Sequence, residues 1–145
     1  MGDPHDLQRF VEAQIPVYER ALEELRAGHK QSHWIWFVFP QIAGLGHSAM
    51  AQRYAISGVD EARAYLEHPL LGPRLHACAQ AMLLHRDRSA RQILGSPDDL
   101  KLRSSMTLFA AAAPEQPLFQ QVLDTFFEGE ADPQTMSRLQ HRPTR

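Results

Sequence analysis

The chain has 145 residues, of which 43% are hydrophobic, and its formal net charge at pH 7 is −2. This composition fits one domain that buries a core without disulfides, and the mixed charges exclude the basic surface that duplex nucleic acid requires. The single cysteine, Cys78, excludes an internal disulfide. Because the N-terminus is polar and no run of 18 apolar residues occurs, we expect no export signal, no membrane span and a cytoplasmic protein.

Two amphipathic helices are expected in the first 28 residues. Asp3-Pro4 is a typical helix start, and apolar residues follow at helical spacing as far as Gln14. Pro16 ends this helix, because the residue before a proline leaves the helical region of backbone space. A second helix then runs from about 16 to 27, with Gly28 as its C-terminal cap.

An aromatic run, His-Trp-Ile-Trp-Phe-Val-Phe-Pro-Gln over residues 33–41, contains both tryptophans of the chain. A lone strand would have no partner for its backbone hydrogen bonds, so we predict a helix here. Helical geometry places Trp34 with Val38 and points Trp36 and Phe39 elsewhere. Two interpretations stay open: a fully buried central helix, or a wall on which a planar group such as a nucleobase stacks.

Helical signals continue through the rest of the chain, and strand signals are nearly absent. Further helices are expected at about 49–55, 58–67, 71–85, 89–94, 97–113, 117–128 and from 132 onward. We therefore predict an all-α fold, a compact single-domain bundle of about seven to eight short helices over residues 3–139. The last residues, 140–145, are expected to form a loose tail.

The clearest helix start lies at residues 96–99. Ser96 is expected as the N-cap and Pro97 at the first helical position, with Asp98 and Asp99 in the first turn. Capping and the helix dipole explain both carboxylates. They are also the candidates for a catalytic carboxylate.

The same helix is unusually polar in its middle. Hydroxyl side chains are unfavourable inside helices, so Ser104 and Ser105 need compensation from packing or from a polar partner. One interpretation is a close helix crossing. The other is a polar wall facing a ligand, in which Lys101 contacts an anionic group and Ser104 or Ser105 donates hydrogen bonds, with Arg103 as a further candidate.

Lysine is rare in this chain: Lys30 and Lys101 are the only two among 15 basic residues. The lysine ammonium is a compact point charge, whereas the arginine guanidinium is a planar fork. A requirement for a point charge would explain lysine at both positions, and chance explains it equally well. Lys30 precedes the aromatic run. The candidates for ligand binding at the aromatic run are Trp34 and Trp36 together with three polar residues around them: Lys30, His33 and Gln41.

We expect neither a metal site nor a cofactor. His29 and His33 are four residues apart, but Gly28 breaks the helix that would align them, and no third ligand lies nearby in the sequence. The dinucleotide fingerprint and the phosphate-binding P-loop are both absent.

Two motifs, Ser32 to Gln41 and Asp98 to Phe109, together with Lys30, carry a resemblance to a known family. With these residues the chain resembles an uncharacterised bacterial domain-of-unknown-function family that has mycobacterial members and is sometimes labelled calpastatin, a label that these residues do not support. The resemblance covers residues 3 to about 139 and implies a compact helical fold.

A fainter similarity points to the NADAR, or YbiA-like, N-glycosidases. It includes an aromatic-rich early helix and a late helix with Lys101, Met106 and, at shifted spacing, Phe109. This similarity implies a ribosyl ligand related to ADP-ribose, although no catalytic carboxylate falls on a matching motif.

These observations lead to two hypotheses for function. The first is a binder or N-glycosidic hydrolase of a small nucleotide-like or ADP-ribose-like ligand, in which the aromatic run stacks the base while Lys30, His33 and Lys101 contact phosphate or ribose. The alternative is a non-enzymatic protein-interaction module with the aromatic run as core. In either case we expect no membrane partner and a monomer or weak homo-oligomer.

Overall fold

The computed structural model describes residues 2–140, and within this range it contains ten helices and no strand. The helices are α1 (Gln8–Gln14), α2 (Tyr18–Ala27), α3 (Ile35–Val38), α4 (Ala49–Arg53), α5 (Val59–Glu67), α6 (Leu71–Leu83), α7 (Ala90–Leu94), α8 (Asp98–Ala112), α9 (Leu118–Phe127) and α10 (Pro133–Gln140). The all-α, single-domain prediction is confirmed. Residues 2–140 form ten helices, more than the seven to eight expected for the bundle, and three of them, α3, α4 and α7, are single turns of four or five residues. Beyond Gln140, the expected tail lies outside the described residues.

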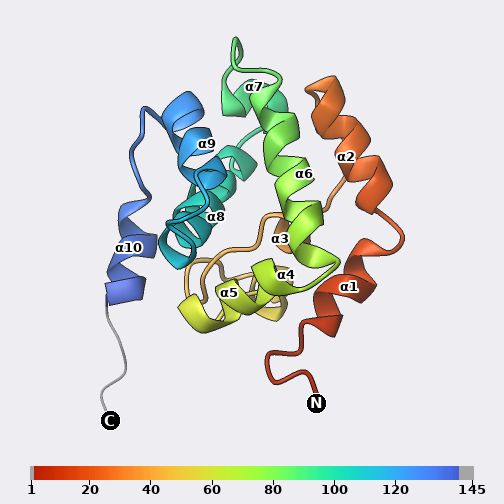
Figure 1. The fold of residues 1–145 in the computed structure, drawn as a ribbon. Helices are drawn as coiled ribbons and strands as arrows, with labels where there is room; N and C mark the ends of the chain where they lie inside the picture. The colour runs from red at the N-terminus through yellow and green to blue at the C-terminus, as the bar shows by residue number, and fades with distance from the viewer. Residues whose placement is uncertain (1, 141–145) are drawn as a thin grey trace.

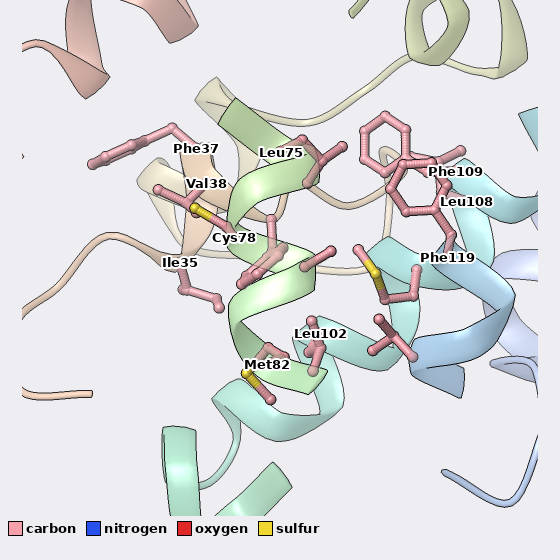
Figure 2. Packing of buried hydrophobic residues seen from close by; sticks show 14 of the residues in the cluster. Ile35, Phe37, Val38, Leu75, Cys78, Met82, Leu102, Leu108, Phe109 and Phe119 are labelled. Atoms are coloured by element: carbon pink, nitrogen blue, oxygen red, sulfur yellow. The ribbon is translucent and has the colours of Figure 1, made fainter. Parts of the chain in front are cut away.

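Helix α6 lies at the centre of the arrangement, with α2 on one side and α8 and α9 on the other (Figure 1). Its apolar residues Leu75, Cys78 and Met82 are fully or almost fully buried. Figure 2 shows them between residues of the aromatic run, such as Val38, and residues of α8 and α9, such as Phe109. Cys78 is therefore a core residue. None of the helices within residues 2–140 has the length and hydrophobicity needed to cross a membrane.

Two of the helix ends follow directly from local sequence. Gly28 takes a left-handed conformation with φ of 77°, as predicted for the cap of α2, and the N–H of His29 donates to the carbonyl of Glu24 at 2.9 Å. At α7, the Ser89 hydroxyl accepts from the N–H of Gln92 while the Gln92 side chain accepts from the N–H of Ser89. This reciprocal pair satisfies two N–H groups that the helix leaves free.

The start of α8 differs from the prediction. The helix begins at Asp98, one residue later than expected, with Pro97 at the N-cap position, and no side chain caps it. The backbone replaces the expected serine cap, since the carbonyl of Gly95 accepts from the N–H of Asp99 and that of Pro97 accepts from the N–H of Leu100. These carbonyls satisfy first-turn N–H groups, so α8 needs no contribution from the Ser96 side chain.

The prediction of one helix through the aromatic run is wrong for most of its length. Only Ile35–Val38 is helical, and the backbone leaves the helix at Phe39, the residue before Pro40. Beyond the proline, Ile42 forms an isolated parallel bridge with Ile56, whose N–H donates to the carbonyl of Gln41 at 2.8 Å. This distant segment supplies the backbone partner that the sequence did not reveal.

Candidate functional site

A carboxylate on α2 fixes the segment that leads into the aromatic run. Glu24 accepts hydrogen bonds from the N–H groups of Gln31 at 2.9 Å and Ser32 at 3.1 Å, from the Ser32 hydroxyl at 2.7 Å and from Trp34 Nε1 at 2.9 Å. Partial burial raises the pKa of Glu24, but these four hydrogen bonds outweigh it and lower the pKa to about 2. The loop between Gly28 and Trp34 is thereby held by an ionised side chain.

Sequence reasoning missed Glu24, although one signal was present. A carboxylate in the last turn of a helix opposes the helix dipole, so its presence there indicates a partner outside the helix. Glu24 occupies that position in α2.

Lys30 lies on this loop, and its ammonium group is almost enclosed. Its Nζ donates to the carbonyl of Ser32 at 2.6 Å, pairs with Asp98 Oδ2 at 2.9 Å and lies 5.0 Å from the centre of a Trp34 ring. The Lys30 side chain is only 7% exposed. Its backbone N–H donates to the carbonyl of Ile93 in α7 at 2.8 Å, which ties the loop to the segment just before α8.

Asp98 connects the two lysines of the chain. Its other oxygen, Oδ1, lies 3.6 Å from Nζ of Lys101, one turn further along α8. The Lys101 ammonium in turn lies 5.5 Å from the centre of a Trp36 ring. The structure therefore brings together Lys30, Trp34, Trp36, Asp98 and Lys101, which we call the lysine–tryptophan cluster.

The two tryptophans in this cluster differ in exposure. Trp34 is fully buried, as are Phe39 and, within a few per cent, Ile35 and Val38, so most of the aromatic run belongs to the core. Trp36 is only partly buried. If a planar ligand stacks on this run, the available ring is Trp36.

Two of the polar candidates on α8 face a different neighbour. Arg103 donates from Nε to the carbonyl of Glu130 and from Nη2 to that of Ala131, both at 3.0 Å. The Ser104 hydroxyl donates to the carbonyl of Leu100 at 3.2 Å and lies 3.4 Å from Asp132 Oδ2. These contacts hold the turn between α9 and α10, so Arg103 and Ser104 are engaged in packing α8 against this turn.

The remaining candidates lie apart from the cluster's contacts. Ser105 is fully buried, and its hydroxyl has no hydrogen-bond partner among the described residues; the same is true of Asp99 Oδ1. His33 is exposed. Gln41 is partly buried and uses its backbone carbonyl for the bridge to Ile56.

The cluster is suited to binding an anion. Two ammonium groups face one carboxylate, so the group of three carries a net positive charge beside a partly exposed indole. Lys101, with a side chain 26% exposed, is the more accessible of the two cations. Within residues 2–140, no group of three or more His, Cys, Asp or Glu side chains is placed to hold a metal ion.

The fold and this cluster define a small all-helical protein in which a lysine–aspartate pair joins the segment after α2 to the start of α8. The chain matches the family model described as "Protein of unknown function (DUF1810)" over residues 4–139, and it belongs to that family. The resemblance inferred from the two sequence motifs is thereby confirmed.

A solved structure supports this assignment. The chain is similar to the conserved hypothetical protein Rv1873 from Mycobacterium tuberculosis, with 53% sequence identity and a TM-score of 0.94. The match covers 97% of this chain and 100% of that one. No curated protein matches the chain.

Proposed function

We propose that this protein binds a small nucleotide-like ligand, of the ADP-ribose type, at the lysine–tryptophan cluster. The observation that carries this proposal is the position of Lys101, whose ammonium lies over one face of the partly exposed Trp36 ring. An aromatic face next to a cation matches a ligand that joins a planar base to a phosphate. The faint similarity to NADAR proteins favours a ribosyl compound for the same role.

The geometry favours binding over N-glycosidic hydrolysis. Cleavage of a glycosidic bond develops positive charge on the sugar, which a free carboxylate stabilises. The Asp98 carboxylate already faces two ammonium groups, at 2.9 Å and 3.6 Å, so its charge is compensated. A ligand that brings negative charge suits this environment better than a reaction that creates positive charge.

The alternative proposal is a non-enzymatic protein-interaction module with the aromatic run as core. The burial of Trp34, Ile35, Val38 and Phe39 speaks in its favour. Trp36 distinguishes the two proposals, because its replacement weakens ligand binding only if a ligand stacks on its ring.

We further propose one domain over residues 3–139 and a monomer or weak homo-oligomer. We also propose a cytoplasmic location, which suits a single reduced and buried Cys78.

A thermal-shift panel with AMP, ADP-ribose, NAD and flavin precursors tests the ligand proposal. A ligand that binds only the folded state stabilises it by about 2.7 kcal/mol at a concentration of 100 Kd, so at least one compound is expected to raise the Tm by several degrees. Trp36→Ala is expected to remove about 1 to 3 kcal/mol of stacking and Lys101→Ala the phosphate contact. Leu100→Ala, at an exposed position on α8, is the matched control.

Two results would contradict the proposal. One is the absence of any shift across the panel for the wild-type protein. The other is an equal shift in wild type, Trp36→Ala and Lys101→Ala, which would place the ligand elsewhere. Co-purification of a stoichiometric protein partner that Trp36→Ala still binds would favour the interaction module.

A further inference from the structure

We propose that Lys101 exchanges partners at this site: it pairs with Asp98 before ligand binding and with the phosphate of the ligand afterwards. This inference rests on the proposed function, because it concerns the same ligand. It assigns different roles to the two lysines and to the two oxygens of Asp98. It also specifies which anionic group the site selects.

The two oxygens of Asp98 are held with different strength. Oδ2 lies 2.9 Å from Lys30 Nζ, a distance typical of a charge-assisted hydrogen bond. Oδ1 lies 3.6 Å from Lys101 Nζ, which exceeds the hydrogen-bond range. The contact with Lys101 is therefore the weaker of the two and the one that a ligand can replace.

Lys30 cannot take part in such an exchange. Its ammonium already meets the carbonyl of Ser32, the carboxylate of Asp98 and the face of Trp34, and the side chain is 7% exposed. A ligand reaching Lys30 would have to displace Asp98 from its shortest contact. Lys30 thus acts as an anchor that keeps Asp98 in place while Lys101 changes partner.

Lys101 has the freedom that the exchange requires. Its side chain is 26% exposed, and among residues 2–140 Asp98 supplies the carboxylate within ion-pair distance. The three donors of an ammonium group rotate about a flexible stem, so a small movement redirects them. The Lys101 ammonium lies over one face of the Trp36 ring, 5.5 Å from the ring centroid, so a base would stack on the opposite face of the same ring.

This arrangement predicts selectivity for phosphate over carboxylate. A ligand carboxylate offers Lys101 only what Asp98 already provides, whereas a phosphate brings more charge and more acceptor oxygens. Asp98 at the same time opposes the incoming anion, because two like charges then share one neighbourhood. Asp98 therefore disfavours an anionic ligand unless the contact of that ligand with Lys101 is stronger than the contact that Asp98 already makes.

The test compares binding of AMP, its uncharged counterpart adenosine and inorganic pyrophosphate to wild type and Asp98→Asn by calorimetric titration. Removing the opposing charge is expected to tighten AMP binding about tenfold and to leave adenosine binding unchanged. Asp87→Asn, at an exposed position between α6 and α7, changes the net charge equally and is the control. Equal or weaker AMP binding by Asp98→Asn would overturn the exchange.

A second variant covers the case in which Asp98→Asn does not fold. Lys30→Met combined with Asp98→Asn removes both members of the buried pair, so no uncompensated charge stays in the interior. It is expected to show a smaller gain for AMP, because the positive charge of Lys30 is lost together with the negative charge of Asp98, and the absence of a gain would again reject the exchange.

The pyrophosphate arm separates this inference from the proposed function. If neither nucleotide nor nucleoside binds but Asp98→Asn gains pyrophosphate binding over Asp87→Asn, the exchange at Lys101 stands and the nucleotide proposal fails. If AMP binds to wild type and Asp98→Asn shows no gain, the proposed function stands and the exchange fails. If no probe binds to any variant, both are rejected.

Discussion

Replacing Glu24 by glutamine tests whether this side chain holds the segment leading into the aromatic run. The carboxylate accepts from Gln31, Ser32 and Trp34 through both oxygens, at distances of 2.7 to 3.1 Å. A glutamine side chain has a single acceptor oxygen and no charge, so it cannot satisfy all these donors. We expect Glu24→Gln to lower the free energy of unfolding and to loosen residues 29–34.

The pKa of Glu24 gives the size of this effect. It falls from 4.5 to about 2 on folding, and at about 1.4 kcal/mol per pKa unit this difference corresponds to about 3 kcal/mol. Because Glu24 is only partly buried, water screens part of the interaction, and we expect a loss of about 1 to 2 kcal/mol at pH 7.

The same pKa predicts how the effect depends on pH. A carboxylate with a lowered pKa contributes its full stabilisation above the pKa of the unfolded chain, here 4.5, and loses it as the pH falls toward 2. The difference in stability between wild type and Glu24→Gln should therefore be constant from pH 7 down to about pH 5 and shrink below pH 4.5.

Urea denaturation followed by far-ultraviolet circular dichroism at pH 7, 5 and 3 measures this difference, provided that the m-value stays unchanged. Glu23→Gln is the control, because Glu23 is the exposed neighbour on the same helix. The reasoning is refuted if Glu24→Gln is as stable as Glu23→Gln at pH 7, or if the difference does not decrease at pH 3.

Three further predictions concern the core and the cluster. In Gly72→Ala the new methyl group would meet the backbone carbonyl of Leu66, so thermal denaturation should show a loss of about 1 to 3 kcal/mol, whereas Gly58→Ala, with open space around it, should be nearly neutral. Burial raises the pKa of Cys78 to about 12, so a thiol reagent at pH 8 should react with it only after unfolding; rapid reaction of the native protein would contradict this. Lys30→Arg should cost about 1 to 3 kcal/mol by chemical denaturation, because a planar guanidinium is larger than the enclosed ammonium, and an unchanged stability would show that the space is less restricted.

The elements that sequence predicted well are those whose ends are determined locally. Gly28 ends α2, and Asp132 accepts from the N–H of Thr135 at 2.9 Å at the start of α10, where the Asp132-Pro133 pair predicted a helix. The aromatic run was predicted less well, because Pro40 ends its helix after one turn and the chain beyond the proline is held by Ile56, which pairs with Ile42 from outside the local segment. Local propensity contains no information about such a partner.

In the candidate site, too, the sequence predicted which residues matter better than it predicted which neighbours they contact. Composition and motif placement selected residues from both segments that meet in the cluster, but both interpretations of the polar residues of α8, a close helix crossing or a wall facing a ligand, gave them a single role. In the structure these residues serve two purposes: Lys101 faces Trp36, and Arg103 and Ser104 bind the turn before α10. Helical periodicity separates the directions of side chains, but it does not reveal which neighbour each direction meets.

The two lysines of the chain, singled out in the sequence by their scarcity, both lie in the lysine–tryptophan cluster. Lys30 places one ammonium within 3 Å of both a carbonyl and a carboxylate, in a space that leaves 7% of the side chain exposed, which suits a compact point charge. Both lysines then contact the same aspartate. Their meeting depends on the hydrogen bond from the N–H of Lys30 to Ile93, which sets the loop against α7 just before α8 begins. A backbone contact between segments distant in the sequence thus brings the two charges to one partner, and the sequence of either segment alone does not show this contact.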